Sequence, residues 1–401
     1  MRVLTFTSLF PNVVTPNSGI FIFQRTSHLA ARPGNFVEVI APVPYLPKLL
    51  RNTRRGSFSS IPDTETVGKL RVHHPRYLLW PGISMPLHGL LMFLGCLATA
   101  RKLHHRHQFD CIDTHYVFPD GLAAMLIGKS LRIPVVVSAR GTDIHTFPSF
   151  TTIRPQICWT LRQAASVIAV SDSLAGTMRN LVPGLRGVDV IGNGVDSTRF
   201  FPGDRSSARC RLGFNPEQRV ILCVAALRHV KGPDLLVRAV ASLKNTIPGC
   251  KLQFIGAGSE LANLRRLAAE LNCADICSFI GSVPNEELRT YYAAADLTCL
   301  PSRKEGWPNV ILESLACGIP VVATRVGAVP AILTPELGVL VDPAPESISA
   351  GLQRALQQDW NSAVISAYAQ RYTWTDVATR VHEVLARSLS QQLLAHSAVC
   401  L

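Results

Sequence analysis

The chain has 401 residues, of which 47% are hydrophobic and 17% charged, and its formal net charge is +13. This length exceeds what one compact core usually holds and predicts two domains of about 200 residues each, and the composition excludes an intrinsically disordered protein. Residues 1–200 contain 21 Lys and Arg against 10 Asp and Glu, a balance of +11, whereas residues 201–401 have a balance of +2.

The basic excess of the first half bears on binding partners. An anionic membrane surface or a phosphate-bearing acceptor would each complement this charge. No sequence signature of an RNA- or DNA-binding module accompanies it, so we expect no nucleic-acid partner.

The cysteines and the apolar stretches predict a cytoplasmic protein. Only Cys273 and Cys277 of the eleven cysteines lie close together, and no second pair with zinc-site spacing follows, which favours reduced thiols. Residues 1–10 suit a first strand better than a signal peptide. Residues 89–100 are shorter than the roughly 20 residues that span a bilayer. Peripheral attachment to the inner face of the plasma membrane stays open.

Strand-like and helix-like segments alternate along the first half, which predicts a parallel sheet covered by helices. The first predicted helix covers residues 20–31 and begins after a loop with Pro11, Pro16 and Gly19. The predicted strands are residues 3–6, 37–41, 110–113, 135–138, 167–170 and 188–191.

Two basic segments of the first half each have two interpretations. Residues 44–62 show little periodicity and predict a loop, either a solvated charge cluster or a contact for a membrane or acceptor. Residues 85–107 predict a helix that is apolar on much of its circumference and ends in the basic run 101–107. Such a helix can lie on a membrane interface. We favour a buried helix with a solvated tail.

Turn residues at 193–196, then Pro202 and a polar run, predict a linker between domains 1–199 and 200–372. The alternation restarts after this linker, which predicts a second α/β domain with a parallel sheet and a cleft between the two domains. Residues 373–392 form one long helical pattern. The predicted strands of the second half are residues 220–225, 252–255, 277–280, 297–300, 321–323 and 339–341.

Ligands of parallel α/β sheets bind outside the carboxyl ends of the strands. In the first half, this rule places His115, Ser171 and the loop 140–143 with Asp143 at such ends. In the second half, it places Arg228 and Lys231 there, in a strand-to-helix loop. Alone, these two cations would be ordinary surface charges.

Residues 301–321 have the strongest functional pattern. A loop with Glu305 follows strand 297–300, and a helix with Glu313 begins near Pro308 and ends near Gly318. Backbone N–H groups at a helix N-terminus bind phosphate. Carboxylates that bind sugar hydroxyls beside amides that bind phosphate indicate a nucleotide-sugar site, although either acid alone would be an ordinary loop or helix-surface residue.

The Glu-x7-Glu spacing of Glu305 and Glu313, with Gly306 after the first acid and Ala-Cys-Gly-Ile-Pro-Val-Val-Ala after the second, resembles the retaining glycosyltransferases of family 4. The resemblance implies the glycosyltransferase B architecture, in which two Rossmann-like domains face each other across a cleft and the C-terminal helix, here 373–392, crosses back onto the first domain. It implies transfer of a hexose-type sugar from a nucleotide-diphosphate sugar to a polysaccharide or lipid-linked glycan. Members from exopolysaccharide and teichuronic acid synthesis have similar loops.

The resemblance also implies roles for single residues. Glu305 binds hydroxyls of the donor sugar, Glu313 binds the ribose, and Arg228 and Lys231 hold the diphosphate and neutralise it as it leaves. His115, from a His-x4-Asp-Gly motif, positions the sugar and supports the transition state. The expected catalytic set is His115, Arg228, Lys231 and Glu305, the further donor contacts are Gly256, Gly258, Gly306, Trp307, Pro308 and Asn309, and the first-domain loop contacts are Gly19 and Asp143.

Some positions depart from the family pattern or from other motifs. Ser18-Gly19 replaces two adjacent glycines, which affects the acceptor contacts, and Trp307-Pro308 replaces an aromatic-Gly pair, which changes the shape around the sugar. Gly256-x-Gly258 is either a tight turn near the nucleotide base or a purely structural turn. Residues 128–130 lack the first Gly and the strand of a Walker A loop, which excludes a P-loop.

Other function classes are alternatives to a glycosyltransferase. A nucleotide-sugar epimerase on the same fold would form product from the donor alone, and a non-catalytic membrane-associated binding partner would turn over no donor. A nicotinamide dehydrogenase is disfavoured because no dinucleotide fingerprint follows the first strand. The chain has no Asp-x-Asp motif. We therefore expect no metal requirement and no cofactor besides the donor substrate.

Overall fold

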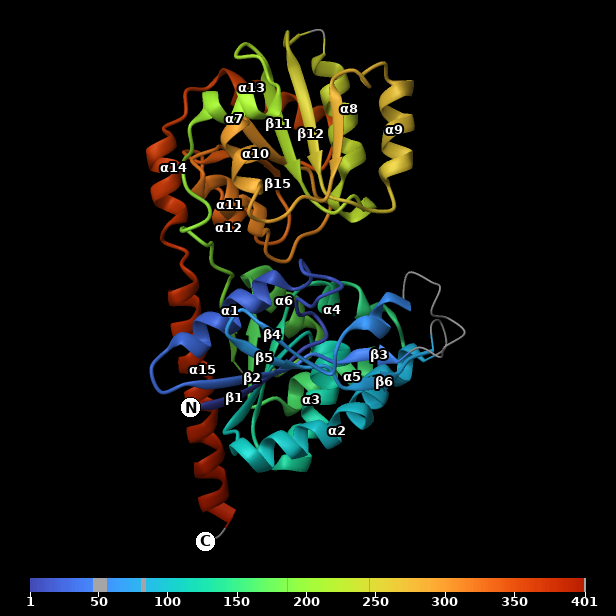
Figure 1. The fold of residues 1–401 in the computed structure, drawn as a ribbon, viewed down its shortest axis with the longest axis vertical. Coiled ribbons are helices and arrows are strands. Elements are labelled where there is room, and N and C mark those ends of the chain that lie inside the picture. The colour runs from blue at the N-terminus through green and yellow to red at the C-terminus, as the bar shows by residue number, and fades with distance from the viewer. Residues whose placement is uncertain (46–55, 81–83, 186, 245, 400–401) are drawn as a thin grey trace. The chain divides into compact units, whose positions relative to one another are not determined.

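A computed structural model of the chain describes residues 1–45, 56–80, 84–185, 187–244 and 246–399. The chain divides into two compact units (Figure 1). Unit 1 comprises Met1–Asn193 and the chain from Trp374 onward, and unit 2 comprises Gly194–Thr373. The first crossing between the units therefore falls inside the predicted turn at 193–196, and not between residues 199 and 200.

Unit 1 contains one large sheet in the order β10-β9-β8-β7-β1-β2-β5-β4, counted over the described residues. All neighbours pair in parallel except β4, which pairs antiparallel with β5. β3 and β6 form a separate parallel pair. The strands are β1 (Arg2–Phe6), β2 (Phe36–Ile40), β3 (Val43–Tyr45), β4 (Thr64–Val67), β5 (Leu70–His73), β6 (Arg76–Leu78), β7 (Cys111–His115), β8 (Val135–Ala139), β9 (Ser166–Ala169) and β10 (Val188–Val190).

Helices lie on both faces of this sheet (Figure 1). The long C-terminal helix α15 packs against α1 and against strands β7, β8 and β9, with Trp374, Val377 and Val381 in the core. The helices of unit 1 are α1 (Ile20–Ala31), η2 (Gly56–Ser60), η3 (Met85–Leu87), α2 (His88–His107), η4 (Val117–Gly121), α3 (Leu122–Leu131), α4 (Thr142–His145), η5 (Phe147–Ser149), α5 (Arg154–Gln163), α6 (Asp172–Leu181) and α15 (Trp374–Val399).

Unit 2 contains a parallel sheet in the order β13-β12-β11-β14-β15-β16. Side chains of β11 alternate between its faces, with Ile221 and Cys223 in one apolar cluster and Val220 and Leu222 in the other, as a strand covered on both sides requires. The elements are α7 (Arg205–Leu212), β11 (Arg219–Val224), η6 (His229–Lys231), α8 (Pro233–Leu243), β12 (Cys250–Ile255), α9 (Leu261–Glu270), β13 (Cys277–Gly281), α10 (Leu288–Ala294), β14 (Leu297–Leu300), α11 (Asn309–Ala316), β15 (Val321–Thr324), α12 (Val329–Ile332), β16 (Gly338–Val341), α13 (Pro345–Gln357) and α14 (Ser362–Ala369).

The predicted fold class, two Rossmann-like α/β domains with a C-terminal helix that packs on the first, is confirmed. The predicted helix at 85–107 exists as η3 followed by α2, and residues 128–130 lie inside α3, which confirms the rejection of a P-loop. Of the predicted loop 44–62, residues 46–55 lie outside the described residues, whereas residues 44–45 end β3 and residues 56–60 form the short helix η2. The ten described cysteines are all free, and seven of them are buried.

Candidate active site

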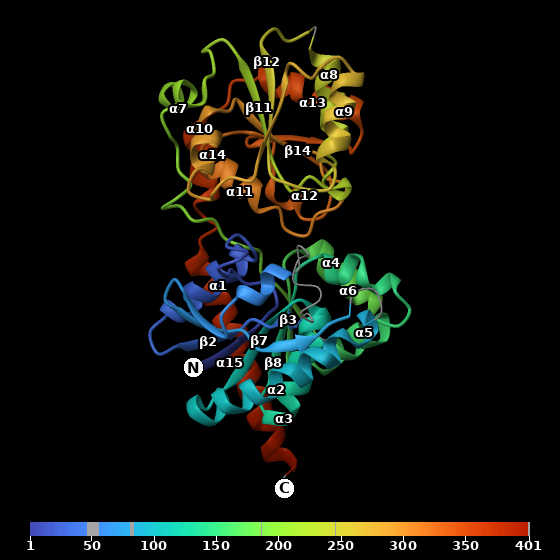
Figure 2. The same ribbon diagram turned by 45° about the vertical axis from the view of Figure 1, so that its right-hand side comes forward.

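Two loops of unit 2 meet where the strand order reverses. β11 and β14 are neighbours in the middle of the sheet, but the helices that follow them, α8 and α11, belong to the apolar clusters on opposite faces (Figure 2). Ligands of doubly wound sheets bind at such a switch point, outside the carboxyl ends of the strands. The loops that leave β11 and β14 carry Arg228, Lys231 and Glu305.

Lys231 and Glu305 form a direct ion pair between these loops. The Lys231 Nζ lies 2.7 Å from Glu305 Oε1, and the hydroxyl of Ser302 donates to the same oxygen at 2.6 Å. The Glu305 side chain is 4% exposed, whereas that of Lys231 is 31% exposed. The carboxylate is therefore fixed by two donors, and the ammonium group keeps an open side.

Arg303 fastens the two loops together beside this pair. Its guanidinium makes a bidentate pair with Asp234, with both N–O distances at 2.7 Å, and donates to the His229 carbonyl at 2.8 Å. Its backbone N–H donates to the Val230 carbonyl at 2.9 Å. The turn that carries Lys231 is thus held by the loop that carries Glu305. No sequence pattern singles out Arg303.

Arg228 behaves differently from Lys231. Its side chain is exposed, and among the described residues its guanidinium has no hydrogen bond or ion pair. Its backbone belongs to the same turn, because its carbonyl accepts a hydrogen bond from the Lys231 N–H at 2.9 Å. The structure therefore brings Lys231 and Glu305 together. Arg228 belongs to the same turn as Lys231, but its guanidinium forms no hydrogen bond or ion pair with either of them.

The segment from Gly306 to Asn309 leads into α11, which begins at Asn309. Pro308 is the N-cap residue and offers no side-chain oxygen to cap the helix. The Trp307 ring lies 6.3 Å from that of Tyr372, and its buried Nε1 has no hydrogen-bond partner among the described residues. Trp307 is therefore half-buried and packs against an apolar cluster of unit 2.

Glu313 lies within α11 and is half-buried. It accepts a hydrogen bond of 3.0 Å from the hydroxyl of Tyr292 on α10. Burial raises the pKa of Glu313 to about 7, against the opposing effects of the Tyr292 hydrogen bond and the Arg199 charge. Glu305 and Glu313 thus have different partners and different surroundings.

Gly256 and Gly258 form a turn against the loop that follows β11. A Cβ at either position would lie within about 2 Å of a backbone oxygen, 2.0 Å from that of Ala225 for Gly256 and 2.1 Å from that of Leu227 for Gly258. The Leu227 N–H donates to the Ala257 carbonyl at 3.1 Å. Both positions therefore require glycine, because a side chain would collide with the backbone of the loop that carries Arg228 and Lys231.

His115 ends β7 and is fully buried in unit 1. An Arg140 Nη donates to its Nδ1 at 2.6 Å, so the ring proton belongs on Nε2, which lies 3.6 Å from Asp113 Oδ2. Burial, then the charges of Arg140 and Arg25, lowers the pKa of His115 well below its ordinary value. The imidazole is therefore neutral, and no part of it reaches the surface of this structure.

A buried charge network surrounds His115. Arg25 pairs with Asp113 through two contacts of 2.8 and 3.1 Å and donates to Ser138 at 2.9 Å. Arg140 also donates to Asn193, the last residue of unit 1 before the chain crosses, at 2.9 Å. The Arg25–Asp113 pair offsets part of the cost of burying these charges, whereas Arg25 Nε, Arg140 Nε and His115 Nε2 are buried without a hydrogen-bond partner among the described residues.

The first-domain loop residues Gly19 and Asp143 have clear structural contacts. Asp143 accepts backbone hydrogen bonds from Val117 at 2.9 Å, Gly141 at 2.7 Å and Arg140 at 3.1 Å. Gly19 precedes α1 with φ 64°, and a Cβ there would lie 2.2 Å from the Leu9 carbonyl oxygen. Both residues shape loops at carboxyl ends of strands.

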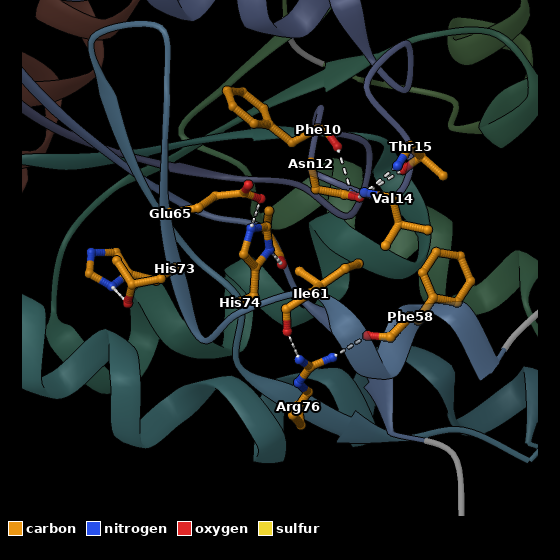
Figure 3. Close-up of polar contacts among 12 residues, drawn as sticks. Phe10, Asn12, Val14, Thr15, Phe58, Ile61, Glu65, His73, His74 and Arg76 are labelled. Atoms are coloured by element: carbon orange, nitrogen blue, oxygen red, sulfur yellow. Dashed lines mark hydrogen bonds and ion pairs between the residues drawn. The ribbon is translucent and has the colours of Figure 1, made fainter. Parts of the chain in front are cut away.

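The loop after β1 is tied to the His115 loop by Asp120, which the sequence did not single out as a site residue. The buried Asp120 carboxylate accepts from the Ser8 N–H at 2.7 Å and from the Ser8 hydroxyl at 2.9 Å. Further along this loop, Asn12 accepts from the N–H groups of Val14 and Thr15 at 3.0 and 2.8 Å (Figure 3). The loop before Gly19 is therefore a defined structure.

Within the described ranges, no group of three or more His, Cys, Asp or Glu side chains is placed to hold a metal ion. Nor does any helix of the described chain have the length and apolar character to cross a membrane.

Comparisons with known proteins cover both units. A family model described as Glycosyltransferase Family 4 matches residues 21–199, and one described as Glycosyl transferases group 1 matches residues 204–372.

Two curated relatives illustrate the similarity. The chain is 32% identical over 332 residues to a D-inositol 3-phosphate glycosyltransferase of Thermobispora bispora, covering 75% of this chain and 76% of the relative. It is 28% identical over 351 residues to the putative teichuronic acid biosynthesis glycosyltransferase TuaC of Bacillus subtilis, covering 86% of each.

Solved structures share the fold. Sucrose-phosphate synthase from Thermosynechococcus elongatus superposes with a TM-score of 0.75 at 21% identity, covering 98% of this chain and 99% of the other. Anabaena HepE, solved in complex with UDP-glucose, gives a TM-score of 0.71 at 19% identity, covering 96% and 99%.

Proposed function

The chain belongs to glycosyltransferase family 4, and from this premise we propose that it is a retaining, metal-independent transferase that moves a hexose-type sugar from a nucleotide-diphosphate sugar to a hydroxyl of a polysaccharide or lipid-linked glycan. The observation that carries the proposal is the Lys231–Glu305 pair at the switch point of unit 2. A cation beside a carboxylate offers groups for both the phosphate and the sugar of such a donor.

The proposed donor contacts follow from the exposure of each group. The ammonium of Lys231 has three N–H donors and directs one at Glu305, which leaves donors for phosphate oxygens. The exposed Arg228 guanidinium adds a second cation, and the start of α11 adds backbone N–H groups and the positive end of the helix dipole. These groups would stabilise the charge that develops on the departing diphosphate.

The carboxylates have separate proposed roles. Glu305, held by Lys231 and Ser302, accepts hydrogen bonds from hydroxyls of the transferred sugar. Glu313 binds the ribose. Solved structures of the same fold include one described as a complex with UDP-glucose, which supports a nucleotide-sugar donor for this chain.

The proposed reaction uses no enzyme nucleophile. The acceptor hydroxyl attacks the anomeric carbon on the face that the nucleotide leaves, and the leaving phosphate takes its proton. His115 is neutral and buried, so its proposed role in positioning the sugar and supporting the transition state is exerted through the loops around it and is not that of a general base. The proposed partners include an anionic membrane surface at which a lipid-linked acceptor would be presented.

A donor screen followed by a transfer assay tests the proposal. UDP-, GDP- and ADP-sugars are compared by thermal shift, and only a true donor should stabilise the protein strongly. The stabilising donor is then incubated with glycan acceptors, and NMR of the anomeric proton should show the donor's configuration in the product, with turnover unchanged by EDTA. Each part of the proposal has a result that would contradict it. Inverted product would contradict retention, and loss of turnover with EDTA would contradict metal independence. Product from the donor alone would contradict transfer to an acceptor, and no turnover with any donor would contradict enzymatic activity.

A further inference from the structure

Helix α2 has a buried face and an exposed apolar face. Its buried residues, among them Met92, Cys96 and Leu103, face the interior where α2 packs against α3 and β6. On another side, Leu90 is 42% exposed and Leu94 is 60% exposed, and Leu87, just before the helix, is 54% exposed. Spacings of three and four residues place these leucines on one side of the helix. The sequence-based choice between a buried and an interfacial helix was therefore incomplete, because α2 has both faces.

Three more exposed hydrophobic residues lie on or next to the two-stranded sheet that α2 packs against. Leu78 of β6 is 62% exposed and pairs in register with Tyr45 of β3, which is 48% exposed, and Trp80 after β6 is 62% exposed. At the start of β6, the Arg76 guanidinium donates to the Phe58 carbonyl at 2.8 Å and to the Ile61 carbonyl (Figure 3). The apolar side chains therefore stand on anchored elements.

The exposed hydrophobic residues are concentrated on α2 and on the elements next to it. Six of the thirteen exposed large hydrophobic residues in the described part of the chain lie on this small group of elements. Isolated exposed hydrophobics are normal, whereas a gathered set marks an interaction surface. We call it the α2 apolar patch, comprising Tyr45, Leu78, Trp80, Leu87, Leu90 and Leu94.

The same side of α2 becomes basic toward its C-terminal end. Arg101 lies seven residues after Leu94 and His105 follows one turn later, with Lys102 beside them, and all three are exposed. No acidic residue occurs in the helix sequence from His88 to His107. A leucine row that runs into cations, with an exposed Trp and Tyr on neighbouring elements, matches the chemistry of a surface that rests in the headgroup region of a bilayer.

We propose that the α2 apolar patch and the basic end of α2 dock unit 1 on an anionic lipid bilayer. The leucines and Trp80 enter the boundary between headgroups and acyl chains, and Arg101 and Lys102 contact anionic headgroups. A second copy of this chain is a poorer occupant, because the patch ends in cations that do not complement themselves. The patch belongs to unit 1 and the Lys231–Glu305 site to unit 2, so the two proposals can fail independently.

Vesicle flotation of the full-length protein tests the docking surface. The protein should float with vesicles of phosphatidylcholine and phosphatidylglycerol, float less at high salt, and stay behind with phosphatidylcholine alone. The double variant Leu90→Gln, Leu94→Gln should bind the anionic vesicles about tenfold more weakly or worse, which corresponds to about 1.4 kcal/mol. The double variant Arg101→Gln, Lys102→Gln should lose a similar factor and most of the salt dependence.

Matched variants on unit 2 control for general effects. Val364→Gln replaces a hydrophobic side chain that is 50% exposed, and Arg265→Gln, Arg266→Gln removes two exposed charges from α9. Both should float like wild type, and all variants should keep the wild-type melting temperature and nucleotide affinity. Equal flotation of the Leu90, Leu94 variant and wild type, equal flotation with neutral vesicles, or no flotation of wild type would overturn the proposal. A wild-type dimer that this variant dissociates, without vesicle binding, would reassign the patch to self-association.

Discussion

Glu305 and Glu313 are the two carboxylates of the family motif, yet they differ in what holds them. Glu305 is buried against Lys231 and Ser302, and Glu313 is half-buried against Tyr292. We predict that Glu313→Ala weakens nucleotide binding about tenfold, because a carboxylate that accepts ribose hydroxyls is lost. Glu305→Ala should reduce the transfer rate far more than nucleotide affinity. Calorimetry with the nucleotide and initial transfer rates separate these effects, and unchanged transfer in both variants would refute the assignment.

The raised pKa of Glu313 gives a prediction for stability against pH. A carboxyl with a pKa of about 7 in the folded chain, against an ordinary 4.5, binds its proton more tightly when folded. The contribution of Glu313 to the free energy of unfolding is therefore fully present below about pH 4.5 and is lost as pH rises through 7. Between pH 5 and 8, wild type should lose roughly 1–3 kcal/mol relative to Glu313→Gln, which stays neutral. Urea unfolding of both proteins at each pH measures the difference, and parallel pH profiles would contradict it.

Sequence patterns found the residues of the motifs but not the partners that hold them. Lys231 and Glu305 could be predicted because each stands in a recognisable loop after a strand. Arg303 and Asp234 are 69 positions apart, and Ser8 and Asp120 are 112 positions apart. Such pairs depend on which strands become neighbours, and a single sequence does not reveal that order at the level of side chains.

At the scale of elements, Arg303 makes one rigid unit of the two loops at the switch point. We predict that Arg303→Ala raises the Michaelis constant for the donor about five- to twentyfold with a smaller change in kcat. The reason is that the turn with Lys231 loses the bidentate pair with Asp234 and the hydrogen bond to the His229 carbonyl. Arg303→Lys should recover part of the loss.

The control for this prediction is Arg265→Ala, which removes an exposed cation from α9 in the same unit. It should leave both kinetic constants unchanged. An Arg303→Ala enzyme with a wild-type Michaelis constant, or one that loses only thermal stability, would show that the Arg303–Asp234 pair does not position Lys231.

Element positions could be predicted well where the apolar runs are clear. The strand at 297–300 and the helix at 20–31 agree with β14 and α1 at both ends. The hairpin of β4 and β5 was not predicted, because its strands are short and carry Glu65 and Arg71 among few apolar residues. An edge hairpin of this kind is specified by its neighbours in the sheet and not by its own pattern.

For the whole molecule, α15 joins the end of the chain to unit 1. Trp374, the first residue of α15, is 4% exposed and lies in the same core cluster as Val3 and Leu29. We predict that Trp374→Ala lowers the free energy of unfolding by about 3 kcal/mol or more, because a large buried side chain leaves a cavity. Urea unfolding followed by circular dichroism measures this. Thr375→Ala, at an exposed position of the same helix, should cost well under half as much, and equal losses would argue against core packing by α15.

The proposed activity requires that unit 2 binds a nucleotide-sugar donor through Lys231. Titration calorimetry of the nucleotide diphosphate into wild type, Lys231→Ala and Lys304→Ala tests this most directly, since Lys304 is an exposed cation of the facing loop. We predict clear binding to wild type and Lys304→Ala, and affinity at least about tenfold weaker for Lys231→Ala. Equal affinity of all three proteins, or no binding to wild type, would show that Lys231 does not bind the donor.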